Sequence, residues 1–567
     1  MKKAIAIAMA LLMLLVCCAC GETPSSNTSS TGSTSSQNTS DVSSDVSSED
    51  TSSEQEEVSA PAQTVTTTTP AGVVLDDMPL IESNIVLDEG LEFPDILPEY
   101  GTQPSTLDTG WNATAPIKKG NTDEAADALR NEILNAKNTA DIYDIKGTIY
   151  YVSPKGNDEN DGKSPETAFQ TTDAVIFTRN VLQPGDAVLF ERGGLWRLLK
   201  TLKCKEGVTY GSYGEGEKPT FYSSPYNYGD AQYWVPSNKK NIWKLGVADA
   251  DIGLIVFNHG ELVGIKKLNG VVTLEKNGDF YYNKNDETLY FYYDGGNPGK
   301  AFDSIEVGYK RNLFSVGNPD VTIDNLRIKY TGAFGIGMNG CDNSVITNCE
   351  IGFIGGAIQS GETRYGNGIQ VWNGVDGHRI ENCWVYQVYD SGVTFQGNYT
   401  YVIDNMSDIY KDVTYKDNLF EYCTYSIEFW HAEEPSPATI ENFNIVGNIS
   451  RFAGYGWGSQ RMNHSGNHIC VFNHSFPNAK NNLFKDNLFD LADSFIVKWG
   501  FTSINNVKGF TFSNNTYYHG KNKFDEAARF GSTKYAYDLS SLESAIGMFE
   551  SDPKLVVWVD TSELISQ

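Results

Sequence analysis

Two carboxylate residues in the second half of the chain have the sequence context of an acid/base pair. Asp390 precedes the bend at Gly392, and Glu428 stands between Ile427 and Phe429. Apolar neighbours raise the pKa of a carboxyl group, which favours a proton donor, so Asp390 would serve as the base or nucleophile. Two carboxyl groups about 5–10 Å apart in different environments can hydrolyse a glycosidic bond. The alternative is that Asp390 caps a turn and Glu428 is a solvated strand residue.

Further polar and aromatic residues surround this pair in the sequence and could bind a sugar substrate. Arginine can bind carboxylates or hydroxyls, and the indole ring of tryptophan can stack on the face of a sugar ring. The candidates are Glu362, Arg364, Gln370, Trp372, Gln396, Trp430, His431, Arg461 and His464, with Glu433 and Glu434 close by. Each of them taken alone could be structural, because tryptophans also cover exposed apolar surface.

The elements that would bring these residues together are the coils of a repeat. Between residues 319 and 518 a pair of short polar residues recurs, mostly followed by apolar residues at alternate positions. The pairs are Asp324-Asn325, Asn348-Cys349, Asn382-Cys383, Asp417-Asn418, Gly447-Asn448, Asp486-Asn487 and Asn514-Asn515. A repeat with strand-like alternation predicts stacked units whose strands pair about 4.8 Å apart. Because asparagine tolerates left-handed backbone, the second members are expected at tight corners that line up as an asparagine ladder.

The fold class predicted from this repeat is all-β, a parallel β-helix or solenoid. Short aromatic strands separated by Asn, Asp and Gly turns predict a small antiparallel β insertion within residues 222–309. Helical spacing over Thr122–Asn138 predicts a short helix that caps the first rung of the solenoid. An antiparallel sandwich with asparagine turns is the alternative fold.

Alignment of the coils on the strand after each bend indicates which side chains share a face. The inward column contains Ile336, Ile369, Val393, Ile427 and Trp457. The next column, which points outward, contains Gly337, Gln370, Thr394, Glu428 and Gly458. A second outward column contains Asn339, Trp372, Gln396, Trp430 and Gln460. Polar and aromatic side chains are therefore expected along one outer face of successive coils.

The opening of the strand region resembles a known superfamily. It contains Tyr150-Tyr151-Val152-Ser153-Pro154, then an Asn/Asp/Gly turn at 156–162, then a Gln-Pro-Gly-Asp turn before the apolar run 187–190. This opening resembles the N-terminal coils of extracellular right-handed parallel β-helix proteins of the pectate-lyase-like superfamily. The resemblance extends over roughly residues 148–518. It implies a right-handed β-helix and a carbohydrate-active protein, since many members are polysaccharide lyases or glycoside hydrolases.

The expected activity is that of a glycoside hydrolase that cleaves a polysaccharide or oligosaccharide. A polysaccharide lyase is the alternative, with Ca²⁺ or arginine neutralising a uronate carboxylate. The aspartate cluster and paired arginines familiar from pectate lyases are not visible in the chain, nor are the paired-Asp and Gly-His-Gly motifs of polygalacturonases. A non-catalytic surface protein that binds carbohydrate or mediates adhesion is the second alternative.

No cofactor or metal is expected for a hydrolase, and Ca²⁺ only for a lyase. The 156–162 loop resembles a calcium-binding Asp/Asn loop but lacks the terminal glutamate, so a structural turn is preferred. No Cys/His set has zinc spacing. The six cysteines after the N-terminal region are predicted to be buried free thiols, with a rung-to-rung disulfide as the alternative. They are Cys204, Cys341, Cys349, Cys383, Cys423 and Cys470.

The N-terminus has the features of an export signal. Two lysines follow Met1, and the apolar run over residues 4–16 is too short to span a bilayer comfortably. The cysteine-rich stretch at 17–20 looks like a bacterial lipoprotein processing site, in which Cys20 would carry the lipid. Cys18 is a rival acceptor, and an ordinary cleaved signal peptide is the alternative. The predicted localisation is extracellular, on the bacterial cell surface, with the membrane contacted only through the lipid anchor.

Charge is distributed unevenly along the chain. The formal net charge is −29, and residues 21–117 contain 17 acidic residues but no lysine or arginine. The remainder is mildly acidic, so binding of nucleic acid is not expected. We expect a monomer in five parts. They are a signal peptide (1–19), a disordered Ser/Thr/acidic linker (20–70), an N-terminal extension with a capping helix (71–147), the β-helix (148–518) and a C-terminal cap (519–567).

Overall fold

The computed structural model describes most of the chain after residue 119. The described residues are 120–175, 181–398, 408–461, 465–473, 475–500, 509–521, 528–530, 533–535, 546–547, 550 and 554–560. The chain divides into two units, residues 1–66 and 67–567, and every described residue belongs to the second. The predicted signal peptide, Cys20 and the linker lie outside the described residues. No helix in the described part is long and apolar enough to cross a membrane.

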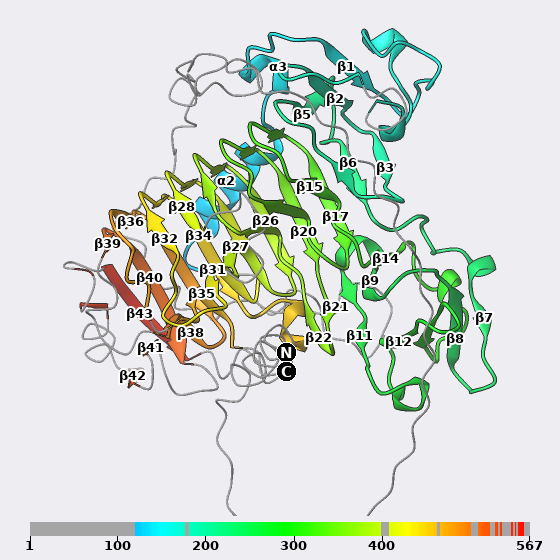
Figure 1. Cartoon of the computed structure of the whole chain (residues 1–567). Helices are drawn as coiled ribbons and strands as arrows, with labels where there is room; N and C mark the ends of the chain where they lie inside the picture. Colours follow the sequence, from blue (N-terminus) through cyan, green and yellow to red (C-terminus); the bar gives the residue numbers. More distant parts are fainter. Residues whose placement is uncertain are drawn as a thin grey trace, which may run out of the picture. The chain divides into compact units, whose positions relative to one another are not determined.

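Three long sheets form the body of the described structure (Figure 1). Sheet 1 consists of β1 (Ile149–Val152), β2 (Ala187–Glu191), β5 (Thr209–Tyr213), β16 (Thr322–Asp324), β19 (Val345–Thr347), β25 (Arg379–Glu381), β29 (Thr414–Lys416), β33 (Asn444–Val446), β36 (Asn482–Lys485) and β39 (Phe510–Ser513). Sheet 2 consists of β3 (Leu195–Arg197), β6 (Thr220–Tyr222), β17 (Arg327–Thr331), β20 (Glu350–Ile354), β26 (Trp384–Val388), β30 (Leu419–Glu421), β34 (Ile449–Ala453), β37 (Leu488–Ala492), β40 (Thr516–Lys521) and β43 (Lys554–Asp560). Sheet 3 consists of β4 (Leu202–Lys203), β15 (Phe314–Val316), β18 (Ile336–Asn339), β23 (Ile369–Trp372), β27 (Ser391–Gly397), β31 (Tyr425–His431), β35 (Asn467–Val471), β38 (Phe495–Trp499), β41 (Ala528–Phe530) and β42 (Thr533–Tyr535).

The order of the strands identifies a parallel β-helix. From β16 to β41, each coil contributes one strand to sheet 1, one to sheet 2 and one to sheet 3 in turn. Among the described strands of these three sheets, those of consecutive coils pair in parallel, and only the terminal pair β41–β42 is antiparallel. Parallel pairing excludes the antiparallel sandwich, and such crossovers are right-handed. The protein is therefore an all-β, right-handed parallel β-helix.

Additional short strands lie in the turns between the main sheets. The turn after sheet 3 contributes a small parallel sheet of β24 (Val375–Asp376), β28 (Ile409–Lys411) and β32 (Thr439–Glu441). The connection between β20 and β23 forms an antiparallel hairpin of β21 (Ala357–Ser360) and β22 (Thr363–Tyr365). This hairpin matters for the candidate site, because it follows sheet 2 and leads directly into sheet 3.

The repeated polar pairs form the corner between sheets 1 and 2. One residue of each pair has a positive φ of 51–69°, which Asn, Asp and Gly tolerate best. These residues are Asn325, Asn348, Asn382, Asp417, Gly447, Asp486 and Asn514. In all but the first pair the left-handed residue is the first member, so the expectation that the second member turns the corner was wrong. The first pair is displaced because Asp324 is in register with Thr347 rather than with Asn348.

The second members of the later pairs form the predicted asparagine ladder. The Nδ2 of Asn418 donates to Oδ1 of Asn448 at 2.9 Å, Asn448 donates to Asn487 at 3.0 Å, and Asn487 donates to Asn515 at 2.9 Å. Each Nδ2 also donates to a backbone carbonyl; Asn418, for instance, bonds to the oxygen of Ile380 at 2.8 Å. These buried amides satisfy backbone groups that the turn leaves unpaired, so the ladder is structural.

Replacing Asn487 with valine is expected to lower the free energy of unfolding by about 1–3 kcal/mol. The variant loses the bonds to Asn515 and to the carbonyl of Ile445, and leaves the amide of Asn448 without its acceptor. Urea unfolding measures the change. Asn444→Val is the control, because Asn444 is exposed on β33. Equal stability of the two variants would contradict a structural role for the ladder.

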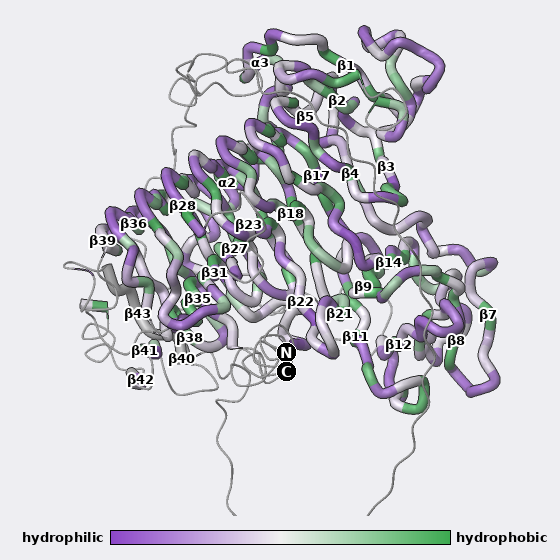
Figure 2. Tube along the Cα trace, viewed as in Figure 1, coloured by the Kyte–Doolittle hydropathy of each residue, from purple (hydrophilic) through white to green (hydrophobic). Residues whose placement is uncertain are grey.

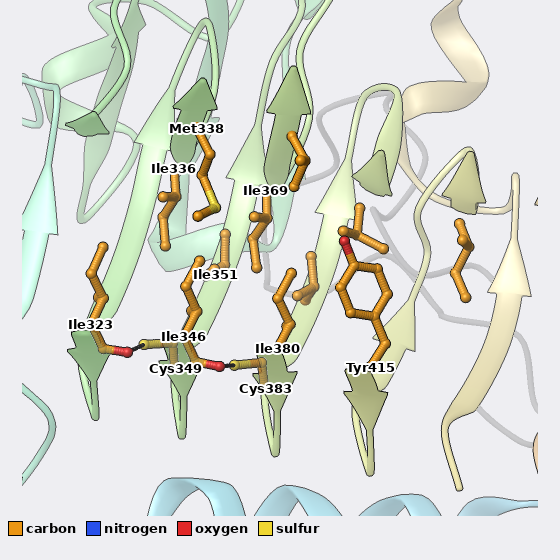
Figure 3. Packing of buried hydrophobic residues seen from close by; sticks show 14 of the residues in the cluster. Ile323, Ile336, Met338, Ile346, Cys349, Ile351, Ile369, Ile380, Cys383 and Tyr415 are labelled. Carbon is orange, nitrogen blue, oxygen red and sulfur yellow. Dashed lines mark hydrogen bonds between the residues drawn. The ribbon is translucent and has the colours of Figure 1, made fainter. Parts of the chain in front are cut away.

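The interior of the β-helix is filled by stacked apolar side chains. Positions that point inward on consecutive coils carry aliphatic residues in register, such as Ile323, Ile346 and Ile380 (Figure 3). Cys349 and Cys383 occupy the ladder position in two early coils, and each Sγ donates to a backbone carbonyl at 3.6–3.7 Å. All six predicted cysteines are buried free thiols, which confirms the prediction. Figure 2 shows hydrophobic positions along the strands and hydrophilic residues at the turns.

The predicted β insertion is present between β6 and β15, and it has its own apolar core. One of its sheets consists of β7 (Val235–Pro236), β8 (Ile242–Gly246), β11 (Ile265–Lys266), β12 (Asp279–Asn283) and β13 (Thr288–Tyr292). The other consists of β9 (Ile252–Phe257), β10 (Leu262–Val263) and β14 (Ile305–Tyr309). Its strands pair antiparallel except β11 and β12, which are parallel.

Helices are short and few in the described part. The predicted helix is α2 (Asp123–Leu134), which is followed by α3 (Thr139–Ile142). The buried face of α2 packs against Leu419, Ile449 and Leu488 on sheet 2, so the expectation that it caps the first rung was wrong. These three residues begin stacked strands and form an apolar stripe that the helix covers. The 3₁₀ turns are η2 (Pro165–Thr167), η4 (Ala231–Tyr233), η5 (Asn258–Gly260), η6 (Val271–Thr273), η7 (Pro298–Lys300) and η9 (Trp457–Gln460).

Candidate active site

The outer face of sheet 3 in the coils of β23, β27, β31 and β35, here called the site face, carries the candidate residues. Ile369, Val393 and Ile427 are in register and fully buried in the core. Because strand side chains alternate, the residues that follow them point outward. The outward column is Gln370, Thr394, Glu428, Cys470 and Lys498, and the next one contains Asn339, Trp372, Gln396 and Trp430. Four coils of the predicted alignment are thus correct.

The fifth coil of the predicted alignment was wrong. Residues 457–460 form the 3₁₀ turn η9, and the strand that pairs with β31 is β35. Cys470 therefore occupies the position next to Glu428 that Gly458 was expected to fill. The large indole of Trp457 packs against the ring of Tyr389, with centroids 5.0 Å apart, and its Nε1 donates to the carbonyl of Gln387. Trp457 therefore lies outside the core column, which Ile427 and Ile469 occupy in the two paired coils.

Asp390 and Glu428 lie on consecutive rungs near the same bend. The amide of Tyr425 on β31 donates to the carbonyl of Asp390 at 3.1 Å, and Glu428 follows three residues later on the same strand. The hydroxyl of Ser391 forms a short hydrogen bond with Oε2 of Glu428, and Nε2 of Gln396 donates to Oε1 at 3.2 Å. The two acidic residues are only 4% and 5% exposed. The structure thus brings the predicted pair together in a shielded site.

The surroundings give the two carboxyl groups unusual proton affinities. Burial, and secondly the charge of Asp390, raise the pKa of Glu428 to about 7. Hydrogen bonds from Ser391 and Gln396 and the charge of Arg461 lower this pKa but do not cancel the rise. Burial also raises the pKa of Asp390, whereas the charge of Arg461 lowers it. Glu428 can therefore hold a proton near neutral pH, as a general acid requires.

Arg461 is the cation of the site. Its Nη1 forms a close ion pair with Oδ1 of Asp390, and its guanidinium lies 5.3 Å from the ring centroid of Tyr425. Arginine stays protonated at any pH at which the protein is folded, so this contact favours the ionised form of Asp390. This ion pair makes the environments of the two carboxyl groups different, because of the two only Asp390 is in direct contact with a cation.

A polar and aromatic surface continues from Glu428 along the site face. Nε2 of Gln370 donates to Oε1 of Gln396 at 3.1 Å, so three coils are linked by the chain Gln370, Gln396, Glu428. Trp372 and Trp430 stand on either side of Gln396 in register, with stacked rings whose centroids are 6.0 Å apart. Both indoles are half-buried. The exposed part of this indole pair, here called the platform, can contact the apolar face of a sugar ring.

Arg364 and Glu362 lie on the β21–β22 hairpin. Arg364 is 8% exposed, donates from Nε to the carbonyl of Gly356 at 2.8 Å and stacks over the ring of Tyr389 at 4.5 Å. Burial lowers the pKa of its guanidinium. Arg364 therefore contacts the residue that precedes Asp390, whereas Glu362 is exposed at the hairpin turn.

His431 belongs to a separate cluster at the end of β31. It is 3% exposed, with Nδ1 at 2.9 Å from Oε2 of Glu433 and Nε2 at 3.4 Å from Oδ1 of Asp408. Oε2 of Glu434 accepts a hydrogen bond from Asn473, whose Oδ1 accepts one from the amide of His431. His464 lies outside the described residues.

Two residues that sequence analysis missed complete the site. Ser391 bonds to Glu428, and Tyr425 lies opposite Ser391 in the register and beneath Arg461. Both residues lie before the aligned positions on their strands. Between Tyr425 and those positions the alternation of β31 is broken, because two successive residues, Ser426 and Ile427, both face the core. A simple alternation pattern cannot cross that irregularity. The signal in the sequence was the position of Ser391 directly after Asp390.

No group of three His, Cys, Asp or Glu side chains in the described part is arranged to hold a metal ion. In the loop at 156–162, the carboxylates bind backbone and hydroxyl groups of the turn. Asp158 accepts from the amides of Gln170 and Thr171 at 2.8 Å, and Asp161 accepts from the hydroxyl of Thr167 at 2.8 Å. The loop thus has the contacts of a structural turn.

The raised pKa of Glu428 predicts a pH-dependent stability. A glutamate titrates near pH 4.5 when unfolded and Glu428 near 7 when folded, so between these values the folded protein binds more protons. The free energy of unfolding should fall as the pH rises through this window, by on the order of 3 kcal/mol. Thermal unfolding at several pH values checks this, because Glu428→Gln should lose less stability over the same window. Identical pH dependence of both proteins would contradict the raised pKa.

Comparison with known proteins gives similarity to solved structures only. No protein-family model matches the chain, and no curated protein matches it in sequence. The complex of XylC with xylose is 12% identical, with 66% of this chain and 70% of that chain covered and a TM-score of 0.39. A structure described as a glycoside hydrolase is 9% identical, with coverage of 73% and 96% and a TM-score of 0.41. The surface adhesin PfbA of Streptococcus pneumoniae is 13% identical, with coverage of 62% and 75% and a TM-score of 0.33. Similarity at this level does not identify a reaction.

Proposed function

We propose that the protein is an extracellular glycoside hydrolase that cleaves a polysaccharide or oligosaccharide. The observation that carries this proposal is the pairing of two shielded carboxyl groups on consecutive rungs of one face. Glu428 has a pKa near 7, and Asp390 is held against Arg461. Two carboxyl groups with such different environments are what acid/base hydrolysis of a glycosidic bond requires.

In the proposed reaction, Glu428 is the general acid. It transfers its proton to the glycosidic oxygen as the bond to the anomeric carbon breaks, so the leaving sugar departs as an alcohol. Positive charge develops on the remaining sugar, and the carboxylate of Asp390 opposes it, either by activating water or by bonding to the anomeric carbon. The ion pair with Arg461 favours the ionised form of Asp390 for this role, and Ser391 and Gln396 orient the carboxyl group of Glu428.

The platform of Trp372 and Trp430 would bind the sugar rings beside the reacting bond. Stacked indoles supply apolar contact, and the side-chain amides of Gln370 and Gln396 supply donors and acceptors for hydroxyl groups. Since the platform extends over three coils, it suits a substrate of several sugar units.

A non-catalytic carbohydrate-binding or adhesion protein is the second candidate. The observation that favours it is the contrast in exposure on the site face: the two indoles are half-buried, while Asp390 and Glu428 are 4% and 5% exposed. A surface of this kind binds a glycan without needing either carboxyl group.

Incubation with a panel of polysaccharides and oligosaccharides separates these candidates. New reducing ends without ultraviolet absorbance of an unsaturated uronate support the hydrolase, and that absorbance would show a lyase instead. Retained binding without any product would favour the adhesion function.

We further propose that Cys20 anchors the protein to the bacterial surface through a lipid, without further contact with the membrane. Replacing Cys20 with serine is expected to release the protein from the membrane fraction into detergent-free supernatant. Cys18→Ser is the matched control, and it should remain membrane-bound. If the Cys20 variant stays bound like the parent, the acceptor has been misassigned.

A further inference from the structure

The β insertion contacts the candidate site through a residue that the proposed function does not use, Gln460. Its Nε2 donates to the carbonyl of Gly264 at 3.0 Å, and its Oε1 accepts from the amide of Lys266 at 3.4 Å. Gln460 ends η9, and the next residue is Arg461, the ion-pair partner of Asp390. A single amide side chain thus bridges the backbone of the insertion and the cation of the site.

A second link involves Lys266 again, through its side chain. Nζ of Lys266 donates to Oδ2 of Asp251 at 2.5 Å and to the carbonyl of Ile252 at 2.6 Å. The same oxygen of Asp251 accepts from the amide of Ile358 on β21 at 2.6 Å. Both charged side chains are more than nine-tenths buried. This buried pair therefore connects β9 and β11 of the insertion to the hairpin, and removal of either partner would leave a buried charge unpaired.

The backbone of the insertion also contacts the backbone of the β-helix directly, where β9 runs beside β17 and β21 (Figure 1). A Cβ added to Gly253 on β9 would lie 2.4 Å from the carbonyl oxygen of Gly355 and 2.5 Å from Cα of Gly332. No side chain fits there, and backbone atoms cannot swing away. The insertion is therefore seated closely on the coil that leads into the site face.

We propose that the β insertion is a positioning unit for the candidate active site, which holds Arg461 against Asp390 through the amide bridge of Gln460. The effect on catalysis rests on the proposed function, whereas the effect on Asp390 does not. Without the bridge, the end of η9 loses both hydrogen bonds to the insertion, and Arg461 gains freedom to leave Asp390. Gln460 is then a positioning residue, since it acts only through Arg461.

Movement of Arg461 away from Asp390 should raise the pKa of Asp390. Several groups from neighbouring elements interact with Asp390 or Arg461, namely Tyr365, Tyr389, Tyr425, Glu428 and Cys470, and Arg364 reaches them through Tyr389. Arg461 is the cation that lowers the pKa of Asp390. When it moves away, burial acts unopposed, and Asp390 takes up a proton at a higher pH.

The experiment compares Gln460→Ala and Gly253→Ala with the control Gly246→Ala. Gly246 lies in β8 of the same insertion, and a Cβ there meets nothing within 4 Å. In the first two variants, the acid limb of the pH profile of kcat/KM should move up by about one pH unit. We expect kcat to fall about tenfold, with KM changed little. The control should match the wild type in all three quantities.

A readout without substrate keeps the inference separate from the proposed function. Each protein is compared with its Asp390→Asn derivative in a Glu428→Gln background, because Asp390→Asn also shifts the titration of Glu428. The difference in melting temperature, followed against pH, then reports the titration of Asp390. The midpoint of this difference should shift to higher pH in Gln460→Ala and Gly253→Ala. An unshifted midpoint in folded Gln460→Ala overturns the positioning role. A shifted midpoint in a protein that cleaves no glycan retains it and refutes only the proposed activity.

Discussion

Replacing Glu428 with glutamine is expected to reduce turnover of a cleavable glycan at least about a hundredfold, the scale of one lost proton donor. Glutamine keeps the size of the side chain; its carbonyl oxygen can accept the hydrogen bond from Gln396, and its amide nitrogen can donate to the hydroxyl oxygen of Ser391. It cannot transfer a proton to the glycosidic oxygen. The measurement is kcat from the release of reducing ends, with folding checked by circular dichroism.

The control for this variant is Glu275→Gln, which changes an exposed glutamate of the insertion and should leave kcat unchanged. A folded Glu428→Gln protein that retains most of the parental kcat would contradict the role of Glu428 as the acid. Substrates whose leaving group departs without being protonated provide a further check. Aryl glycosides with an acidic phenol should lose far less rate in the variant than natural glycans do.

Replacing Asp390 with asparagine is expected to cut kcat by a similar factor of about a hundred, because the charge that opposes the developing cation is lost. This variant has a second effect that Glu428→Gln lacks. The charge of Asp390 is the second cause of the raised pKa of Glu428, so its removal should lower that pKa. The pH window in which stability falls should then end at a lower pH than in the wild type.

Loss of Asp390 also leaves Arg461 without its ion-pair partner, which should cost up to a few kcal/mol of stability. Asp376→Asn is the matched control, since Asp376 is an exposed aspartate on β24 and the change should affect neither kcat nor stability. A normal kcat for Asp390→Asn, in a protein that Glu428→Gln inactivates, would contradict the role of Asp390 as the partner of Glu428.

The fold could be predicted from the sequence because each coil of the β-helix repeats the same local sequence pattern. Each coil carries its own polar pair and its own strand alternation, so Asn418, Asn448 and Asn487 identified the corner without any knowledge of distant contacts. The position of α2 depended instead on an apolar stripe made by Leu419, Ile449 and Leu488, which belong to three different coils. A pattern read along one segment does not contain that stripe.

The candidate site could be predicted only as far as the register holds. Thr394 and Glu428 fall opposite each other because β27 and β31 are regular from Val393 onward. In the next coil, the local sequence Gly456-Trp457-Gly458 resembles the start of the earlier strands but forms a 3₁₀ turn, and the strand that pairs with β31 begins at Asn467. The contacts of Gln460 with the insertion join residues nearly two hundred positions apart, and nothing in the local sequence signals them.

The most direct test of the central claim, that Glu428 and Asp390 form an acid/base pair, is the pH profile of kcat/KM on the glycan that the protein cleaves. A protonated Glu428 with a pKa near 7 must act as the acid, so the rate should fall above about pH 7. An ionised Asp390 must act as its partner, so the rate should also fall on the acidic side. A rate that keeps rising from neutral to alkaline pH, as abstraction of a proton by a base would produce, would contradict the account.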